Sequence, residues 1–551
     1  IDPGRILAVT FTNKAAEEMS RRISAALGPE SGVPEVATFH ALGYRIIRRN
    51  LTETGRSEGF ALIDQDEQAS VISGLAGCGA SRARALREGI SRMRQGVAGR
   101  ESGQDPEAAE VLPHYLQWLR ERNLFDLDDL IVEAVRLLEE YEEIRNFWRD
   151  RFSRVLVDEF QDINQAQYRM LRLLCPDPGS SICVIGDPDQ AIYGFRGSDV
   201  GFMKTFREDY PSAGVYSLKR SYRCTDTILR ASSEVLNEGS GDRSLQGLSR
   251  GVRIRISRQV SDRSEAEFTA RTIEEMVGGL RSFSMYSRIS AGEEAESIGS
   301  LSDFAVLCRT ARQMDLFEEA FHNHAVPYQR VGGGGFLEAP AVRRILDCLN
   351  CLRNPGNDYF RGKLGDMADR IAAGLTAPGP GTEVARFLKD LAGNCIPESQ
   401  DDPAVLQLFE FSTGFGENFE SFYHFLDLGS EPDLYRDSSE SVALMTIHAA
   451  KGLEFECVFI PGCEEGILPF RFPGSEDVDL DEERRIFYVG MTRARRYLFL
   501  THAASRFVFG RKAERRRSPF LDAIEARLIE ELRAEERQKP EKREDRQLKL
   551  F

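Results

Sequence analysis

The chain has 551 residues, of which 41% are hydrophobic and 29% are charged, and its formal net charge is −16. This length allows several domains with cores of their own, and the mixed composition excludes a disordered chain. No run approaches the roughly 18 consecutive apolar residues of a membrane span, so no membrane partner is expected. The acidic excess argues against binding to nucleic acid through an overall positive field, although a local basic groove is still compatible with it.

Ten cysteines are scattered along the chain, and only Cys348 and Cys351 are closely spaced. A metal site would need a second pair, or histidines at ligand spacing, and none follows. We therefore predict two half-buried thiols one turn apart on a helix over 342–352, in a protein of the reducing cytoplasm.

The N-terminal part of the chain alternates between strand-rich and helical stretches. Residues 1–50 predict two strand–turn–helix units, 51–150 are mostly helical, and 151–200 return to buried strands. Two of these strands, at 155–157 and 182–185, are followed by acidic residues. A short apolar strand that ends at Asp and leads into a helix is typical of a parallel α/β sheet, whose ligand site lies at the carboxyl ends of the strands.

A second strand-rich block starts near Val215. Its clearest apolar strands are predicted at 304–307, 442–447, 458–460 and 497–500. Between Pro355 and Asp437 the chain is predicted to be loop-rich, because the cluster at 378–381 combines Pro and Gly, and we interpret this stretch as an insertion. Residues 521–546 predict a highly charged helix and tail.

These patterns predict two α/β bodies, each interrupted by another segment. The predicted boundaries are 1–54 with 151–205 for the first body, 55–150 for a helical insertion, 206–354 with 438–505 for the second body, 355–437 for a short insertion, and 506–551 for a charged C-terminal tail.

One motif places two carboxylates side by side at the end of a strand. Residues 155–162 read VLVDEFQD, so Asp158 and Glu159 directly follow the apolar segment. One carboxylate at such a place can hold Mg²⁺ beside a nucleotide, while the other orients and deprotonates an attacking water. The alternative is an acidic helix N-terminus favoured by the helix dipole.

Four more motifs accompany VDEFQD: TFTNKAAEEM at 10–19, GDPDQAIYGFRG at 186–197, TIHAAKGLEF at 446–455 and YVGMTRA at 488–494. In order and approximate spacing the set resembles the UvrD/Rep/PcrA-like DNA helicases of superfamily 1, from Ile6 to about Ala503. The resemblance implies an α/β fold with two RecA-like parallel-sheet bodies, each interrupted by a mainly helical inserted subdomain. It also implies an ATP-dependent 3′→5′ DNA helicase or translocase that serves DNA repair or replication.

The resemblance further implies an ATP and Mg²⁺ site. In it, Asp158 is the Mg²⁺ ligand, Glu159 the base that activates water, and Gln190 a sensor of the γ-phosphate. Two guanidinium groups from the second body suit the charge of a transferring phosphoryl group. The remaining nucleotide-binding residues implied are Arg223 and Arg493 as arginine fingers, Tyr222 on the adenine ring, Glu454 on the ribose, and Gly452.

Single-stranded DNA and its junctions with duplex are the other implied partner. Aromatic side chains that stack on bases tolerate any sequence, as a stepping motor requires, although core packing is the alternative for each Phe. The DNA-facing residues implied are Phe11, His40, Tyr193, Phe195 and His448, with Thr10, Thr12, Asn13, Thr38, Arg309 and Thr446 as further contacts.

The chain departs from the family pattern in three respects. No G-x-x-x-x-G-K-[ST] phosphate loop occurs, and the family places that loop upstream of TFTN. Because the first residue is Ile1 rather than Met, we expect the loop to precede this chain and the 551 residues alone to lack ATPase activity. In addition, Phe195 replaces the usual Trp, Ser221 replaces the usual Asn, and the insertion at 355–437 is short for the family.

Two other functions remain open: the helicase part of a helicase–nuclease, and a DNA-binding regulator without ATPase activity. The chain ends in Gln547, Leu548, Leu550 and Phe551 around Lys549. An extended peptide with this spacing can place its apolar side chains in a groove. The pattern resembles the short peptide by which bacterial DNA-processing enzymes bind the replication sliding clamp.

Overall fold

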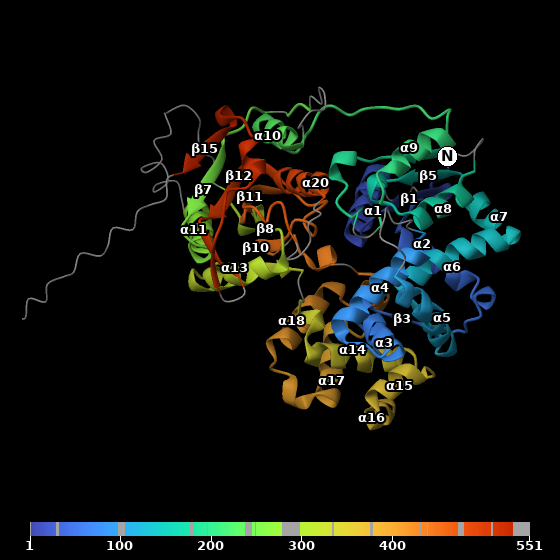
Figure 1. Ribbon diagram of the computed structural model, residues 1–551. Coiled ribbons are helices and arrows are strands. Elements are labelled where there is room, and N and C mark those ends of the chain that lie inside the picture. Colours follow the sequence, from blue (N-terminus) through green and yellow to red (C-terminus); the bar gives the residue numbers. More distant parts are fainter. Residues whose placement is uncertain are drawn as a thin grey trace, which may run out of the picture. The chain divides into compact units, whose positions relative to one another are not determined.

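The computed structural model describes most of the chain (Figure 1). The described residues are 2–28, 32–96, 105–176, 181–194, 197–236, 245–247, 249–277, 298–332, 335–374, 378–429, 431–437, 439–471, 479–508 and 511–532. They form two compact units. Unit 1 contains Ile1–Ser217 and Arg330–Asp437, and unit 2 contains Leu218–Gln329 and Ser438–Phe551.

Unit 1 contains a four-stranded parallel sheet in the order β2-β1-β5-β6. The strands are β1 (Ile6–Thr10), β2 (Glu35–Thr38), β5 (Arg154–Val157) and β6 (Ser181–Val184). They form where the sequence predicts short apolar strands. In the described part of unit 1, β6 has no neighbour on its outer side. Near this edge Leu156 is 40% exposed, Ile185 is 53% exposed, and Cys183 is exposed as well.

Six helices accompany this sheet in unit 1: α1 (Asn13–Leu27), α2 (Phe39–Arg49), α6 (Leu127–Glu140), α7 (Glu142–Arg151), α8 (Gln165–Leu174) and α9 (Gly201–Asp209). Helix α6 packs against both α2 and α8. The apolar faces of α2, α6, α7, α8 and α9 and the buried strand residues Val9 and Val157 form one core. Burial contributes a stabilising free energy of about 25 cal/mol per Å² of apolar surface. The core formed in this way holds the carboxyl ends of the strands in place.

The rest of unit 1 is a helical body made from two distant stretches of sequence. The first stretch contains β3 (Ala61–Ile63), α3 (Gln65–Ala76), α4 (Ala80–Arg94), α5 (Pro106–Glu121) and β4 (Leu124–Asp126). The second contains α14 (Pro340–Arg353), α15 (Asp358–Leu364), α16 (Asp366–Gly374), α17 (Val384–Cys395), α18 (Pro403–Ser412) and α19 (Phe419–Leu428). Both stretches contribute to one hydrophobic core, in which Trp118 packs edge-on against Tyr359 at 5.4 Å.

The prediction of a loop-rich stretch between Pro355 and Asp437 is wrong, because α15 to α19 make most of it helical. The Pro-Gly cluster at 378–381 occupies only the connection between α16 and α17, and apolar residues at helical spacing fill the remainder. The chain divides between the units at Gln329, whereas the predicted boundary at 354 follows α14. Helix α14 carries Cys348 and Cys351, which are buried free thiols.

Unit 2 is built on a seven-stranded sheet in the order β15-β7-β12-β11-β8-β10-β9. Its strands are β7 (Ile254–Gln259), β8 (Phe304–Cys308), β9 (Tyr328–Val331), β10 (Val442–Thr446), β11 (Phe455–Ile460), β12 (Ala494–Ala503) and β15 (Ile529–Leu532). The five pairings from β15 through β10 are parallel. The helices of the unit are α10 (Asp226–Leu236), α11 (Asp262–Val277), α13 (Ala311–Asn323), α20 (Leu480–Met491) and α21 (Pro519–Asp522), and a hairpin joins β13 (Ser505–Val508) to β14 (Arg511–Glu514).

The helix predicted over 521–546 is wrong in its described part. Strand β15 pairs in parallel with β7, with Ile529 opposite Ile254. Its end residues Ile529 and Leu532 are partly buried while the two acidic residues between them are exposed, so the edge of a sheet suits the segment better than a solvated helix. Residues 533–551, including the predicted clamp-binding peptide, lie outside the described residues.

A buried ionic cluster ties α11 to the β13–β14 hairpin in unit 2. The Arg506 guanidinium donates from Nε to Glu464 at 2.8 Å and also pairs with Glu265. Neither carboxylate side chain has any exposed surface. The Thr501 hydroxyl donates to Glu265 at 2.7 Å, so neighbouring polar groups also satisfy the buried charges.

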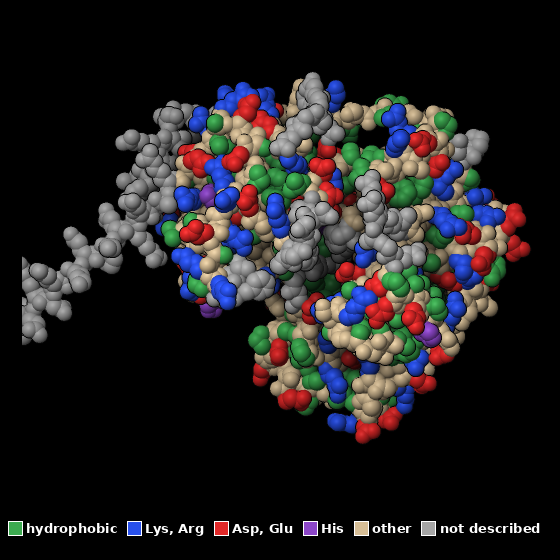
Figure 2. Space-filling model, viewed as in Figure 1, with side chains coloured by type: hydrophobic (Ala, Val, Ile, Leu, Met, Phe, Trp, Pro, Cys, Tyr) green, Lys and Arg blue, Asp and Glu red, His purple; other side chains and the backbone are tan. Residues whose placement is uncertain are grey.

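The fold is therefore α/β with two parallel sheets of the RecA-like kind. Figure 2 shows Lys and Arg side chains interspersed with Asp and Glu on the face in view, without a large region of one sign. Within the described ranges, no helix has both the length and the apolar composition that crossing a bilayer requires.

Candidate functional site

The adjacent carboxylates Asp158 and Glu159 lie at the carboxyl end of β5, as predicted. The backbone N–H of Asp158 donates to the carbonyl of Val9 on β1 at 2.8 Å, and Phe160 donates to Ile185 beyond β6 at 2.9 Å. Glu159 has a φ of 52°, a left-handed conformation that non-glycine residues adopt at a cost. Bonds to strands on both sides thus hold this turn in a specific shape.

Gln161 orients the Glu159 carboxylate, and the sequence reasoning missed it. Its side chain is fully buried; the amide nitrogen donates to Glu159 at 2.5 Å and the amide oxygen accepts from the N–H of Asp187 at 2.9 Å. A Cβ at Gly186 would lie 2.8 Å from that oxygen, so glycine permits the close approach. The sequence feature that could have identified Gln161 is an amide side chain two residues after a pair of carboxylates.

Gln190 belongs to the same hydrogen-bonded chain. Its amide donates to the Asp187 carboxylate at 2.8 Å. Burial raises the pKa of Asp187, and hydrogen bonds from Gln190 and the Asp189 N–H oppose that rise. Hydrogen bonds therefore connect Gln190, through Asp187 and Gln161, to Glu159, so the structure brings together two of the predicted catalytic residues.

The predicted phosphate contacts of unit 1 lie at two helix N-termini. Strands β1 and β2 end in register at Thr10 and Thr38, and each leads into a helix. The Thr12 hydroxyl accepts from the Ala15 N–H at the start of α1, and the Thr38 hydroxyl caps α2 in the same way, both at 3.2 Å. Thr38 also donates to the Asn13 side-chain oxygen at 3.4 Å. Thr10 is completely buried, so its side chain is not at the surface.

Two of the predicted base-stacking aromatics stack on each other. The rings of Phe11 and Tyr193 lie 4.9 Å apart at an interplanar angle of 21°. This contact leaves Tyr193 only 6% exposed, whereas Phe11 and His40 are half-buried. Phe195 lies outside the described residues.

In unit 2, Glu454 joins a predicted arginine finger to a second arginine. Arg223 Nε donates to Glu454 at 2.6 Å, and Arg495 pairs with the other oxygen at 2.5 Å. Partial burial pushes the pKa of Glu454 upward, but the two ion pairs bring it below its usual value. Tyr222 is 76% exposed, as a ring available for stacking should be. Arg495 was missed because its arginine-rich surroundings gave no reason to select it.

The second predicted finger, Arg493, is 1% exposed. Its guanidinium donates to the carbonyls of Val489 at 2.9 Å and Leu453 at 3.2 Å. Gly452 directly precedes Leu453. Its φ is +87°, a conformation that residues with side chains rarely adopt. The bond to Leu453 thus brings Arg493 next to the segment that carries Gly452 and Glu454, with the Arg493 side chain packed inside the unit.

Arg309, Thr446 and His448 follow two neighbouring strands, because β8 and β10 pair with Thr446 opposite Cys308. Arg309 forms an ion pair with both oxygens of Glu483 and lies over the Phe470 ring at 5.0 Å. The Thr446 hydroxyl accepts from the Ala449 N–H at 3.2 Å. These residues therefore lie at the carboxyl ends of β8 and β10 in the unit 2 sheet, where Arg309 is already paired with Glu483.

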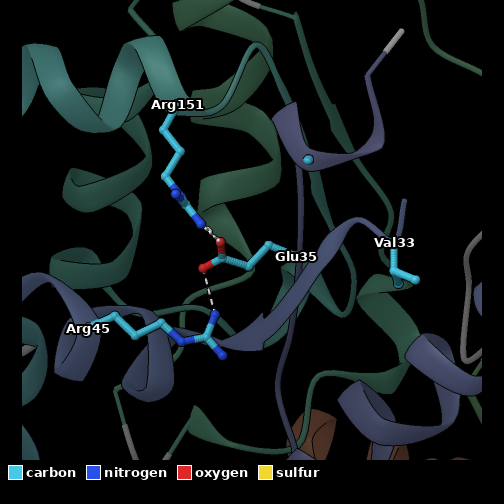
Figure 3. Close-up of a pocket in the computed structure, with 5 residues that line it drawn as sticks. Val33, Glu35, Arg45 and Arg151 are labelled. Atoms are coloured by element: carbon cyan, nitrogen blue, oxygen red, sulfur yellow. Dashed lines mark hydrogen bonds and ion pairs between the residues drawn. The ribbon is translucent and has the colours of Figure 1, made fainter. Parts of the chain in front are cut away.

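A hollow of about 390 Å³ lies elsewhere in unit 1, at the amino ends of the strands (Figure 3). Glu35, the first residue of β2, pairs with Arg45 at 2.5 Å and with Arg151 at 2.8 Å. Because it lies at the end of the sheet opposite the carboxyl ends of the strands, this hollow is not the predicted nucleotide site.

Two family models match the chain. The model of the UvrD/REP helicase N-terminal domain matches residues 1–211. The model of the UvrD-like helicase C-terminal domain matches residues 216–368 and 407–505. The chain therefore belongs to the UvrD-like helicase family.

Among individual proteins, the chain is similar to enzymes named ATP-dependent DNA helicase PcrA. The Staphylococcus epidermidis protein is 30% identical over 98% of this chain and 82% of its own length. A Staphylococcus aureus protein is 29% identical over 96% of this chain and 81% of its own length. A solved C-terminal domain of a possible DNA helicase from Lactobacillus covers 56% of this chain and 98% of its own at 11% identity, with a TM-score of 0.25, too low to support an argument.

Proposed function

We propose that this protein is an ATP-dependent DNA helicase or translocase that moves 3′→5′ on single-stranded DNA in repair or replication. The observation that carries the proposal is the hydrogen-bonded chain of Glu159, Gln161, Asp187 and Gln190 in a member of the UvrD-like helicase family. A general base must be held in one orientation to activate a water, and this chain of bonds supplies that restraint.

The residues present fit Mg²⁺ held together with a nucleotide. Asp158 offers one carboxylate at the end of a buried strand, and Mg²⁺ is commonly bound by one or two carboxylates plus substrate phosphates. Among the described residues, no group of three or more His, Cys, Asp or Glu side chains is placed to hold a metal ion by itself. When bound, the ion would neutralise charge on the transferring phosphoryl group.

The remaining roles are those that the resemblance to the family implies, and the chemistry of the residues suits them. Glu159 accepts the proton of the attacking water and Gln190 bonds the γ-phosphate. Arg223 and Arg493 stabilise charge on that phosphate, while exposed Tyr222 stacks on the adenine and Glu454 binds the ribose. We also propose that the protein binds junctions of single-stranded and duplex DNA, that it is cytoplasmic, and that it serves DNA repair or replication.

Phe11→Ala is expected to weaken single-stranded DNA binding by the 551-residue chain. Loss of one stacked base removes roughly 1–3 kcal/mol, which is about a 5- to 150-fold rise in Kd. Fluorescence anisotropy with a labelled oligonucleotide measures this. Phe147→Ala, at a partly exposed Phe on α7, is the matched control and should leave Kd unchanged. Equal Kd values for the two variants, with a lower melting temperature for Phe11→Ala alone, would assign Phe11 to the core.

The C-terminal peptide carries a separate proposal, that it binds the replication sliding clamp. Such a tether would raise the local concentration of the motor at replicating DNA without changing its catalytic site. A synthetic peptide ending in Gln547–Phe551 is expected to bind purified clamp, and removal of these residues should abolish clamp binding by the whole chain. No peptide binding at high micromolar clamp, or equal binding by the truncated chain, contradicts the proposal.

A further inference from the structure

A short acidic segment of unit 1 covers the start of helix α1. This segment, residues 432–437, follows α19 and includes most of the 3-10 turn η10 (Glu431–Leu434). We call it the acidic strap, because it carries Asp433 and Asp437 and packs on α1 from more than 400 positions away in sequence. Its hydrogen-bonding partners on α1 are Asn13, the last residue of the TFTN motif, and Lys14, which follows it.

Asp433 accepts hydrogen bonds at the N-terminus of α1. Its Oδ1 accepts from the backbone N–H of Lys14 at 2.8 Å, and its Oδ2 lies 3.5 Å from the Asn13 amide nitrogen. The same amide donates to the carbonyl of Leu428 at 2.7 Å. The Lys14 N–H is therefore directed at the strap, and the Asn13 amide is directed at the strap and at the end of α19.

The side chain of Lys14 is occupied by the strap as well. Its Nζ donates to Asp437 Oδ1 at 2.6 Å and to the carbonyl of Tyr435 at 3.2 Å, and it lies 4.4 Å from the centre of the Tyr435 ring. These contacts leave the Lys14 side chain only 21% exposed, while Asp437 remains 72% exposed. The strap thus holds the one cation at the start of α1.

These donors form the set that binds a phosphate. Helix N-termini present free N–H groups and a partial positive charge, and α1 and α2 begin beside each other at the ends of paired strands. A side-chain amide and a lysine complete the set. In this structure a carboxylate, rather than a phosphate, accepts from them.

We propose that the acidic strap is an autoinhibitory contact, in which Asp433 and Asp437 take the donors that a phosphate of single-stranded DNA uses. The proposal rests on the proposed function, since it requires that Asn13 and its neighbours contact DNA. The strap must leave α1 before the phosphate binds, so the apparent affinity for DNA is reduced by the fraction of molecules in which it is bound.

The strap is anchored to the helical body at a second point. Tyr435 is buried, and the Arg436 guanidinium donates to the carbonyl of Phe411 on α18 while lying 4.9 Å from its ring. The acidic groups can therefore leave α1 while the anchor on α18 persists, and displacement couples DNA binding to the helical body.

The test is single-stranded DNA binding by the whole chain carrying Asp433→Asn with Asp437→Asn. Asparagine keeps the size and accepting oxygen of each side chain but removes its charge. We expect the Kd to fall at least about fivefold, because charged hydrogen bonds are the stronger competitors. Asp390→Asn with Glu417→Gln changes the net charge equally at exposed positions of the helical body and should alter Kd less than about twofold.

Amide hydrogen exchange of the unsubstituted chain gives an independent measurement. Addition of the oligonucleotide should speed exchange in 432–437 and slow it at the start of α1. If the chain binds DNA but the two double variants have equal Kd values and the strap stays protected, the autoinhibitory contact is refuted while the proposed function stands. If neither the unsubstituted chain nor any variant binds DNA, the proposed function fails and the strap proposal with it.

Discussion

Glu159→Gln is expected to reduce DNA-stimulated ATP hydrolysis by at least about a hundredfold, because positioned general bases contribute roughly 10²–10⁴ to the rate. Glutamine keeps the shape of the side chain and can still bond Gln161, but it does not accept the proton of the attacking water. ATP binding should persist. The measurement is steady-state phosphate release, with single-stranded DNA, by a protein that includes the phosphate loop expected from the family pattern.

Glu143→Gln is the matched control for this variant. Glu143 is exposed on α7 in the same unit, so the same chemical change there should leave the rate unaltered. Near-normal hydrolysis by Glu159→Gln, with nucleotide affinity unchanged, would contradict the assignment of Glu159 as the base.

Arg506→Met is expected to lower the stability of unit 2 by about 3–5 kcal/mol, since it leaves two buried carboxylates without their cation. Glu265 and Glu464 have no exposed surface, so water cannot replace the lost ion pairs without structural change. Urea unfolding followed by circular dichroism measures the loss in the transition assigned to unit 2.

Two further variants test the cause of that loss. Arg263→Met removes an exposed ion pair with Glu319 and should cost no more than about 1 kcal/mol. Adding Glu265→Gln and Glu464→Gln to Arg506→Met should restore part of the stability, because no buried charge then remains unpaired. Equal losses for Arg506→Met and Arg263→Met would show that the cluster is not a stabilising element.

The sequence predicts the described strands of the unit 1 sheet, and β8, β10, β11 and β12 of unit 2, because they contain short apolar runs. It does not predict β7, β9 or β15, in which polar and charged residues interrupt the apolar ones. It fails where tertiary packing decides. The 355–437 stretch becomes helical because its apolar residues pack with those of α3 to α5, a partnership between segments more than 200 residues apart. Strand β15 forms because β7 offers an edge, although its own residues are half acidic.

The candidate site divides in the same way. Motifs identify Glu159 and Gln190, but the amide of Gln161 and the carboxylate of Asp187 that connect them are revealed only by the fold. The sequence also does not show which polar side chains are already hydrogen-bonded within the protein. Asn13 and Arg309 were predicted to contact DNA, and in this structure both are bonded within the protein, to Leu428 and to Glu483.

The outer edge of β6 affects how this chain behaves in concentrated solution. In the described part of unit 1, β6 has no strand on its outer side, and Leu156 and Ile185 are exposed beside it, so its outward N–H and C=O groups lie next to apolar surface. Such an edge is a template on which a second chain can add a strand, and it carries neither the lysine nor the proline that discourages this. We therefore expect the chain to aggregate through β6, increasingly so as its concentration rises.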